Sequence, residues 1–88
     1  MTCDKTKTIC DTYGKDKQII KAIEEMNELT HELFKELNKK GVKKNIIEEM
    51  ADVFNCLDNL QYILNIKWSE VIDIMYEKKD REIKRIKK

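Results

Sequence analysis

Apolar residues recur every three or four positions over most of this chain, the spacing that places them on one side of an α-helix. The runs that follow this spacing cover about residues 16–39, 45–65 and 70–88. Asp16, Asn45 and Ser69 stand at or next to their starts, and such short polar side chains accept hydrogen bonds from backbone N–H groups of a first turn. No run alternates between apolar and polar positions as a strand would. The pattern therefore predicts an all-α protein with three helices.

The connection between the first two predicted helices is short, from about residue 39 to residue 45, and it contains Gly41. Glycine readily takes the left-handed conformation that often ends a helix. Because so short a connection leaves little room, we expect the two helices to lie side by side and antiparallel, as a helical hairpin. The side of the first helix that we expect to face the core consists of Ile19, Ile23, Met26, Leu29, Leu33, Phe34 and Leu37.

Residues 1 to about 15 show no clear period, so we expect a flexible arm or an irregular lead-in there. Residues 16–88 then form a single domain. The chain has 88 residues, no proline and two glycines, and 40% of its residues are charged. This composition agrees with helices and few tight turns. Because a chain this short buries a limited fraction of its surface, we also expect a partner chain.

Three cysteines, Cys3, Cys10 and Cys56, form an odd set without a C-x-x-C spacing. We therefore expect a reduced, cytoplasmic protein, and neither a disulfide framework nor a zinc site. No apolar run approaches the length of a signal or membrane-spanning segment, so we expect no membrane partner. The net charge of +1 and an acidic stretch over residues 24–36 oppose binding to nucleic acid.

Carboxylates recur in two similar pentads, EEMNE at residues 24–28 and EEMAD at residues 48–52. Residues three positions apart share a helix face, so Glu25 lies beside Glu28, and Glu49 lies beside Asp52. Two such faces brought together make a four-carboxylate site. Carboxylates packed side by side raise one another's pKa unless a cation lies among them, and carboxylate oxygen is a preferred ligand of Mg²⁺ and Mn²⁺. The two pentads therefore predict a divalent metal site.

An acidic string on a helix is most often a solvated face, so the first pentad alone is a weak signal. Glu49 is more informative, because it falls between two groups of apolar residues on its helix, where a carboxylate costs free energy unless it is paired or bound to metal. A buried salt bridge is the alternative. It is less favoured, since no basic residue occurs between Asn45 and Ile66.

Lys78, Arg81 and Arg85 follow one side of the third predicted helix, the side that carries Val71 and Ile74 one or two turns earlier. Their long stems can cover apolar surface while their charged ends reach a polyanion such as phosphate. Salt bridges to the acidic first helix are an equally good interpretation. Asn55, about one turn after Asp52, can contact a base or sugar edge, or it can be exposed polar surface.

The EEMNE pentad, twenty intervening residues and then Glu49-Met50-Ala51-Asp52 resemble the E-E-x-x-E and E-x-x-D pair of the MazG-like all-α nucleoside triphosphate pyrophosphohydrolases. The resemblance covers roughly residues 16–86, and Ala51 replaces a glycine common in that family. It implies a small single-domain member in which Glu25, Glu28, Glu49 and Asp52 bind Mg²⁺, with Mn²⁺ as a possible substitute. It also implies a homodimer or tetramer that completes a four-helix-type bundle.

The reaction implied by the resemblance is hydrolysis between the α- and β-phosphates of a nucleoside triphosphate, giving a nucleoside monophosphate and pyrophosphate, as in house-cleaning of the nucleotide pool. Glu24 would accept the proton of the attacking water. Lys78, Arg81, Arg85 and Asn55 would hold the substrate. Two readings without catalysis stay open: a helical dimerisation or regulatory module, and a metal-dependent nucleotide sensor. The sequence does not identify the preferred base or sugar.

Overall fold

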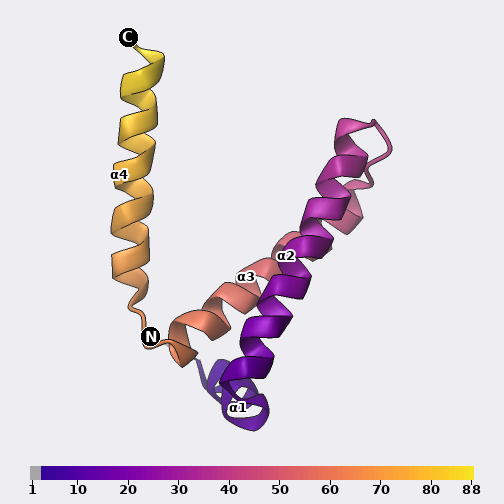
Figure 1. The fold of residues 1–88 in the computed structure, drawn as a ribbon, viewed down its shortest axis with the longest axis vertical. Helices are drawn as coiled ribbons and strands as arrows, with labels where there is room; N and C mark the ends of the chain where they lie inside the picture. Colours follow the sequence, from indigo (N-terminus) through magenta and orange to yellow (C-terminus); the bar gives the residue numbers. More distant parts are fainter. Residues whose placement is uncertain (1–2) are drawn as a thin grey trace.

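The computed structural model describes residues 3–88, and this part of the chain folds into helices joined by short turns (Figure 1). The helices are α1 (Asp4–Tyr13), α2 (Lys15–Leu37), α3 (Lys43–Ile63) and α4 (Trp68–Ile86). The described residues form no strand, so the predicted all-α class is confirmed. The three helices predicted from the apolar spacing correspond to α2, α3 and α4. None of the described helices is both long enough and apolar enough to cross a membrane.

The predicted helix caps are wrong by two or three residues. The positions that precede α2, α3 and α4 lack a side-chain cap hydrogen bond, and they are occupied by Gly14, Val42 and Lys67. Asp16, Asn45 and Ser69 fall inside the first turns, because each helix begins earlier than the apolar spacing alone indicates. A carboxylate in a first turn still interacts favourably with the helix dipole, which applies to Asp16.

Helix α2 ends in a Schellman motif, but Gly41 is not its left-handed residue. Lys39 takes that conformation, with φ of 60°. The N–H of Lys40 donates to the carbonyl of Lys35 at 2.8 Å, and the N–H of Lys39 donates to the carbonyl of Glu36 at 2.9 Å. Gly41 matters for another reason, since a Cβ there would lie 2.9 Å from the Cα of Glu36. The turn therefore needs glycine for a close approach of the backbone.

The N-terminal segment differs from the expected flexible or irregular arm. Asp4–Tyr13 form α1, which packs against α3 and the beginning of α2. Gly14 connects α1 to α2 with φ of 85°, a conformation that side chains rarely allow. Thr6 and Cys10 are the buried residues of α1. Because α1 has buried contacts of its own, it belongs to the same folded unit as the hairpin. Residues 1–2 of the predicted arm lie outside the described residues.

Helices α2 and α3 lie side by side and antiparallel, as the short connection predicts (Figure 1). The buried residues of the two helices are both polar and apolar. Gln18, Ala22 and Glu25 are the buried residues of α2, and Cys56 and Gln61 are those of α3. Ala22, which is 1% exposed, lets the two helices approach closely. The hairpin therefore buries a carboxylate and amide side chains together with small apolar ones, while larger apolar residues such as Leu29 and Leu60 are half-buried.

Much of the apolar surface predicted to form the core is exposed within this single chain. The physical reason is that one neighbouring helix covers only one stripe of α2, and the adjacent apolar stripe is left exposed by the described residues. Helix α3 shows the same exposure on its outer side. The exposed apolar residues of the two helices include Ile23, Leu33, Phe34 and Leu37 on α2, and Ile47, Met50, Phe54 and Leu57 on α3.

Helix α4 extends away from the hairpin, as Figure 1 shows, and it contains no buried residue. The radius of gyration is 15.8 Å, whereas a compact domain of this length would have about 12 Å. The described chain therefore has an open shape in which α4 projects from the end of α3. Asn65, with φ of 55°, is the left-handed residue that ends α3 before this turn.

Candidate metal centre

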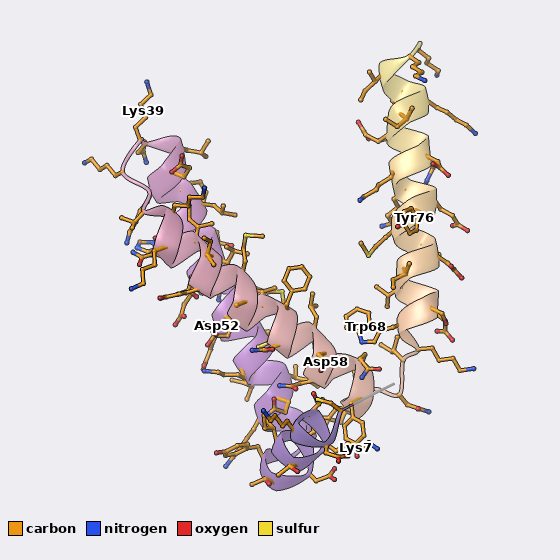
Figure 2. All side chains as sticks on the ribbon, turned by 180° about the vertical axis from the view of Figure 1, so that it is seen from behind. Lys7, Lys39, Asp52, Asp58, Trp68 and Tyr76 are labelled. Carbon is orange, nitrogen blue, oxygen red and sulfur yellow. The ribbon has the colours of Figure 1, made fainter. Side chains whose placement is uncertain are left out.

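Three carboxylates from α2 and α3 meet near the middle of the hairpin. Glu25 on α2 and Glu49 and Asp52 on α3 each offer one oxygen, and these oxygens all lie within 4.8 Å of one another. We call these three residues the carboxylate trio; Asp52 is labelled in Figure 2. Because α2 and α3 run antiparallel from one short turn, residues at similar distances before and after the turn face each other. The hairpin thus brings the two acidic pentads together, as the sequence predicts.

Two oxygens of the trio are buried without a donor. Glu25 is 5% exposed, and its Oε2 atom has no hydrogen-bond partner among the described residues. The same holds for Oε2 of Glu49. Burying a carboxylate oxygen without a donor or a cation is unfavourable. These unpartnered oxygens, both hard ligands, fit a divalent cation such as Mg²⁺.

Lys21 pairs with the trio within α2. Its Nζ atom lies 2.8 Å from Oε1 of Glu25, one helical turn away. The hydrogen bond from Lys21 lowers the pKa of Glu25, against the effect of burial. The same pairing raises the pKa of Lys21. Glu25 is therefore held in its ionised form although it is buried. This contact was missed at the sequence level, although the i, i+4 spacing of a lysine and a glutamate was a usable signal.

The pKa of Glu49 is shifted in the opposite direction to that of Glu25. Burial raises the pKa of Glu49, and the negative charges of Glu28, Asp52 and Glu25 raise it further. Like charges held together favour the protonated form unless a cation neutralises them. The trio therefore contains one carboxylate compensated by a lysine and another that is uncompensated. That uncompensated charge is what a bound cation would relieve.

The remaining carboxylates predicted for the site lie at its edge. Glu28 is exposed and lies close enough to affect the pKa of Glu49, but it is not one of the trio. Glu24 is exposed, and its charge acts on Lys21. Glu32, which was not assigned to the site, is partly buried: its Oε1 atom accepts a hydrogen bond from Lys35 at 3.2 Å, and its Oε2 atom has no partner among the described residues.

A cavity of about 540 Å³ opens beside the trio, between α1, α2 and α3. Glu25 and Asp52 line it together with Lys21, Asn55 and Tyr13. Its volume is in the range of small-molecule sites. Asn55, predicted to contact substrate, thus faces the same space as two of the predicted metal ligands. Tyr13 was given no role by the sequence, because nothing local indicated that α1 would pack here.

The predicted phosphate-binding residues lie elsewhere in this chain. Lys78, Arg81 and Arg85 are exposed on α4, where they line one shallow surface pocket. Arg85 pairs with Glu82 of its own helix at 3.1 Å. Among the described residues, no ion pair joins these three side chains to α2. Their role in substrate binding stays a prediction, and it requires α4 of another subunit or a different placement of α4.

A second polar cluster, not predicted from the sequence, lies between α1, α3 and the start of α4. Asp58 accepts a hydrogen bond from Oγ1 of Thr6 at 2.6 Å and another from Nε1 of Trp68 at 3.3 Å. Figure 2 shows Trp68 beside Asp58 where α3 gives way to α4. Nδ2 of Asn59 donates to Oε1 of Gln18 at 3.0 Å. We call Asp58, Thr6 and Trp68 the Asp58 cluster, and its carboxylate has a donor on each oxygen.

Comparison of the chain with models of known protein families, with curated proteins and with solved structures found no match.

Proposed function

We propose that this protein is a Mg²⁺-dependent nucleoside triphosphate pyrophosphohydrolase that releases a nucleoside monophosphate and pyrophosphate. The observation that carries the proposal is the carboxylate trio: one oxygen of each residue lies within 4.8 Å of the others, and Glu25 and Glu49 each have a buried oxygen without a partner among the described residues. The E-E-x-x-E and E-x-x-D pair described above supports the choice of reaction. The adjoining cavity would give a substrate access to Glu25 and Asp52, which line it.

Glu25, Glu49 and Asp52 would hold the cation, with Glu28 at the edge of the site as a further ligand. A bound Mg²⁺ would neutralise phosphate charge and acidify a water molecule for attack on the α-phosphorus. Glu24 is our candidate for accepting the proton of that water, because it is an exposed carboxylate one position from Glu25. Asn55 faces the cavity and can donate to a sugar or phosphate oxygen.

The test is incubation of the purified protein with Mg²⁺ and a panel of canonical and modified nucleoside triphosphates, with all phosphate products resolved. We expect monophosphate and pyrophosphate, and no product after chelation or in Glu49→Gln. Glu48→Gln is the matched control, because it alters the neighbouring, exposed carboxylate of the same pentad. Orthophosphate and diphosphate as products would contradict the proposed bond cleavage. Binding of nucleotide with Mg²⁺ but without any product would favour a sensor instead.

We further propose that the active form is a homodimer or a dimer of dimers. The exposed apolar stripes of α2 and α3 support this, because contiguous apolar surface of this kind is covered in stable proteins. A second hairpin against them would complete a four-helix bundle. In such an assembly, α4 of one subunit can bring Lys78, Arg81 and Arg85 to the trio of the other.

Light scattering coupled to size-exclusion chromatography tests the assembly. We expect a dimer or tetramer for the wild-type protein and a monomer for Phe54→Glu, because Phe54 is 64% exposed in the single chain and lies on the outer stripe of α3. Tyr76→Glu on α4 is a control of similar exposure outside that stripe. A monomeric wild-type protein that hydrolyses nucleotides would exclude the subunit-sharing arrangement and leave the metal centre in place.

A further inference from the structure

The cavity beside the carboxylate trio is larger than the metal centre needs, and one of its walls comes from α1. The proposed reaction assigns a role to the acidic end of this space. It assigns none to the end formed by Ile9 and Tyr13. Those two residues are four positions apart on α1 and so share one helix face. The question is what an aromatic and aliphatic wall opposite a metal centre would bind.

The cavity has two chemically different ends. Glu25 and Asp52 line the acidic end, while Lys17 lines the cavity eight residues earlier on α2. Eight residues correspond to about 12 Å along a helix. The hydrogen bond between Gln18 and Asn59 marks that second end on the hairpin face. A molecule lying along the cavity would therefore meet carboxylates at one end and amide, lysine and tyrosine side chains at the other.

Two features position helix α1 over this second end of the cavity. Gly14 allows the sharp turn into α2, and the bond from Thr6 to Asp58 fixes α1 on α3. Tyr13, the last residue of α1, is 57% exposed although it lines the cavity. An aromatic ring that is accessible at the edge of a polar cavity offers a stacking surface for a nucleobase.

We propose that this cavity binds the nucleoside part of a nucleoside triphosphate, with the base against Tyr13 and the phosphates toward Glu25 and Asp52. The proposal rests on the proposed function, since it places the substrate relative to the same metal centre. It makes α1 the element that recognises the base. Asn55, which lines the cavity from α3, then lies between the two ends, where the sugar would be.

The test compares two probes by isothermal titration calorimetry in the presence of Mg²⁺: α,β-methylene analogues of the common nucleoside triphosphates, and inorganic tripolyphosphate, which has no nucleoside. We expect Tyr13→Ala to weaken binding of the analogues about tenfold, the effect of losing one stacked base, and to leave tripolyphosphate binding unchanged. Tyr13→Phe should restore analogue binding. Tyr76→Ala, which removes a tyrosine of similar exposure on α4, should change neither.

Equal binding of analogue and tripolyphosphate by the wild-type protein, or an unchanged analogue affinity in Tyr13→Ala, would overturn the proposed placement. Either result would leave the proposed metal centre standing, provided that the protein still cleaves triphosphates. Failure of the wild-type protein to bind either probe would instead overturn the proposed function. The two failures are therefore distinguishable.

A second inference concerns Lys21; it rests on the proposed metal centre and on a separate observation, the 2.8 Å contact of Lys21 with buried Glu25. Among the described residues, the Lys21 ammonium is the positive charge that forms an ion pair with the trio, and its side chain is 57% exposed and lines the cavity. We infer that Lys21 acts as a tethered counter-ion that a divalent cation displaces. The displaced ammonium then faces the space assigned to the phosphates.

Titration with Mg²⁺ alone tests this inference. Lys21→Met keeps the length of the side chain and removes its charge, so we expect Mg²⁺ to bind severalfold more tightly once its competitor is gone. Lys35→Met is the control, because Lys35 pairs at 3.2 Å with Glu32 of the same helix, which is not part of the trio, and it should leave Mg²⁺ affinity unchanged. Unchanged or weaker Mg²⁺ binding in Lys21→Met would overturn the inference, as would a wild-type protein that binds no Mg²⁺.

Discussion

The carboxylate trio joins α2 to α3, whereas the Asp58 cluster joins α3 to α1 and α4, and the two clusters differ in whether their carboxylate oxygens have hydrogen-bond donors. Each oxygen of Asp58 accepts a hydrogen bond, from Thr6 and from Trp68. In the trio, Glu25 and Glu49 each keep one buried oxygen without a partner among the described residues. Both clusters join helices. Their difference is that one is complete within the chain and the other is not.

This difference separates a structural role from a binding role. A fully hydrogen-bonded carboxylate stabilises the arrangement of the groups that donate to it, and Asp58 joins α1, α3 and α4 in this way. Carboxylates with unpartnered oxygens and mutual repulsion destabilise the fold unless something positive binds to them. The comparison therefore predicts that substitutions in the two clusters have opposite consequences for stability and for activity.

The largest expected effect is on turnover. Asp52→Asn removes a negative charge from the trio with little change of shape, and we expect nucleotide hydrolysis to fall by at least about a hundredfold. The melting temperature should stay unchanged or rise, because one source of like-charge repulsion is lost. Product formation and thermal unfolding, measured on the same preparation, check this. A large fall in melting temperature together with the loss of turnover would assign Asp52 a structural role.

The converse substitution is Asp58→Ala. It leaves the donors of Thr6 and Trp68 without their acceptor, and Thr6 is buried, so we expect the free energy of unfolding to fall by about 2 to 3 kcal/mol. Mg²⁺ affinity should not change, because Asp58 is not part of the trio. Urea unfolding and Mg²⁺ titration measure the two quantities. Unaltered stability would mean that the Asp58 cluster contributes nothing to the fold.

A smaller effect is expected in the pH dependence of stability without metal. The pKa of Glu49 in the folded state is raised above the ordinary value of 4.5, so the folded state binds more protons than the unfolded state at pH values just above 4.5. Stability from Glu49 is therefore lost as the pH rises through that interval. The lowered pKa of Glu25 works the other way, adding stability as the pH rises toward 4.5.

Urea unfolding in the presence of a chelator, from pH 4.5 to neutral pH, tests this pH dependence. We expect a decline of the midpoint in the wild-type protein and a flatter profile in Glu49→Gln. Saturating Mg²⁺ should remove the decline, because the cation binds the ionised carboxylates. If the urea midpoint varied with pH in the same way in the wild-type protein and in Glu49→Gln, the raised pKa of Glu49 would be contradicted.

The same comparison explains how much could be predicted from the sequence. The trio follows from local patterns, because the spacing within each pentad fixes a helix face and the short turn fixes which faces meet. Helix class and the antiparallel hairpin follow for the same reason. The Asp58 cluster could not be predicted, since Thr6 and Asp58 are 52 residues apart in the chain and neither carries a recognisable motif.

The errors at the sequence level share a physical origin. Helix α1 was expected to be irregular because its ten residues show little apolar periodicity, and it is held in place by polar contacts such as that of Thr6. The core was overestimated because apolar spacing shows which side of α2 is apolar but not whether a neighbour covers it. Lys39, and not Gly41, has the left-handed conformation. In a Schellman motif the hydrogen bonds require that conformation at the second residue after the last helical one, and this residue is Lys39.

The smallest expected effect is at the solvent-exposed edge of the contact between α1 and α3. The hydroxyl of Tyr62 donates to Oδ1 of Asp11 at 3.2 Å, and this bond is exposed, so water can replace either partner. We expect Tyr62→Phe to change the free energy of unfolding by no more than about 0.5 kcal/mol, several times less than Asp58→Ala. Urea unfolding of the two variants side by side measures the ratio. If Tyr62→Phe lowered the free energy of unfolding as much as Asp58→Ala does, the exposed contacts of α1 would stabilise the fold as much as the hydrogen bonds of Asp58. The hydrogen bonding of Asp58 would then no longer mark the Asp58 cluster as the structural one of the two clusters.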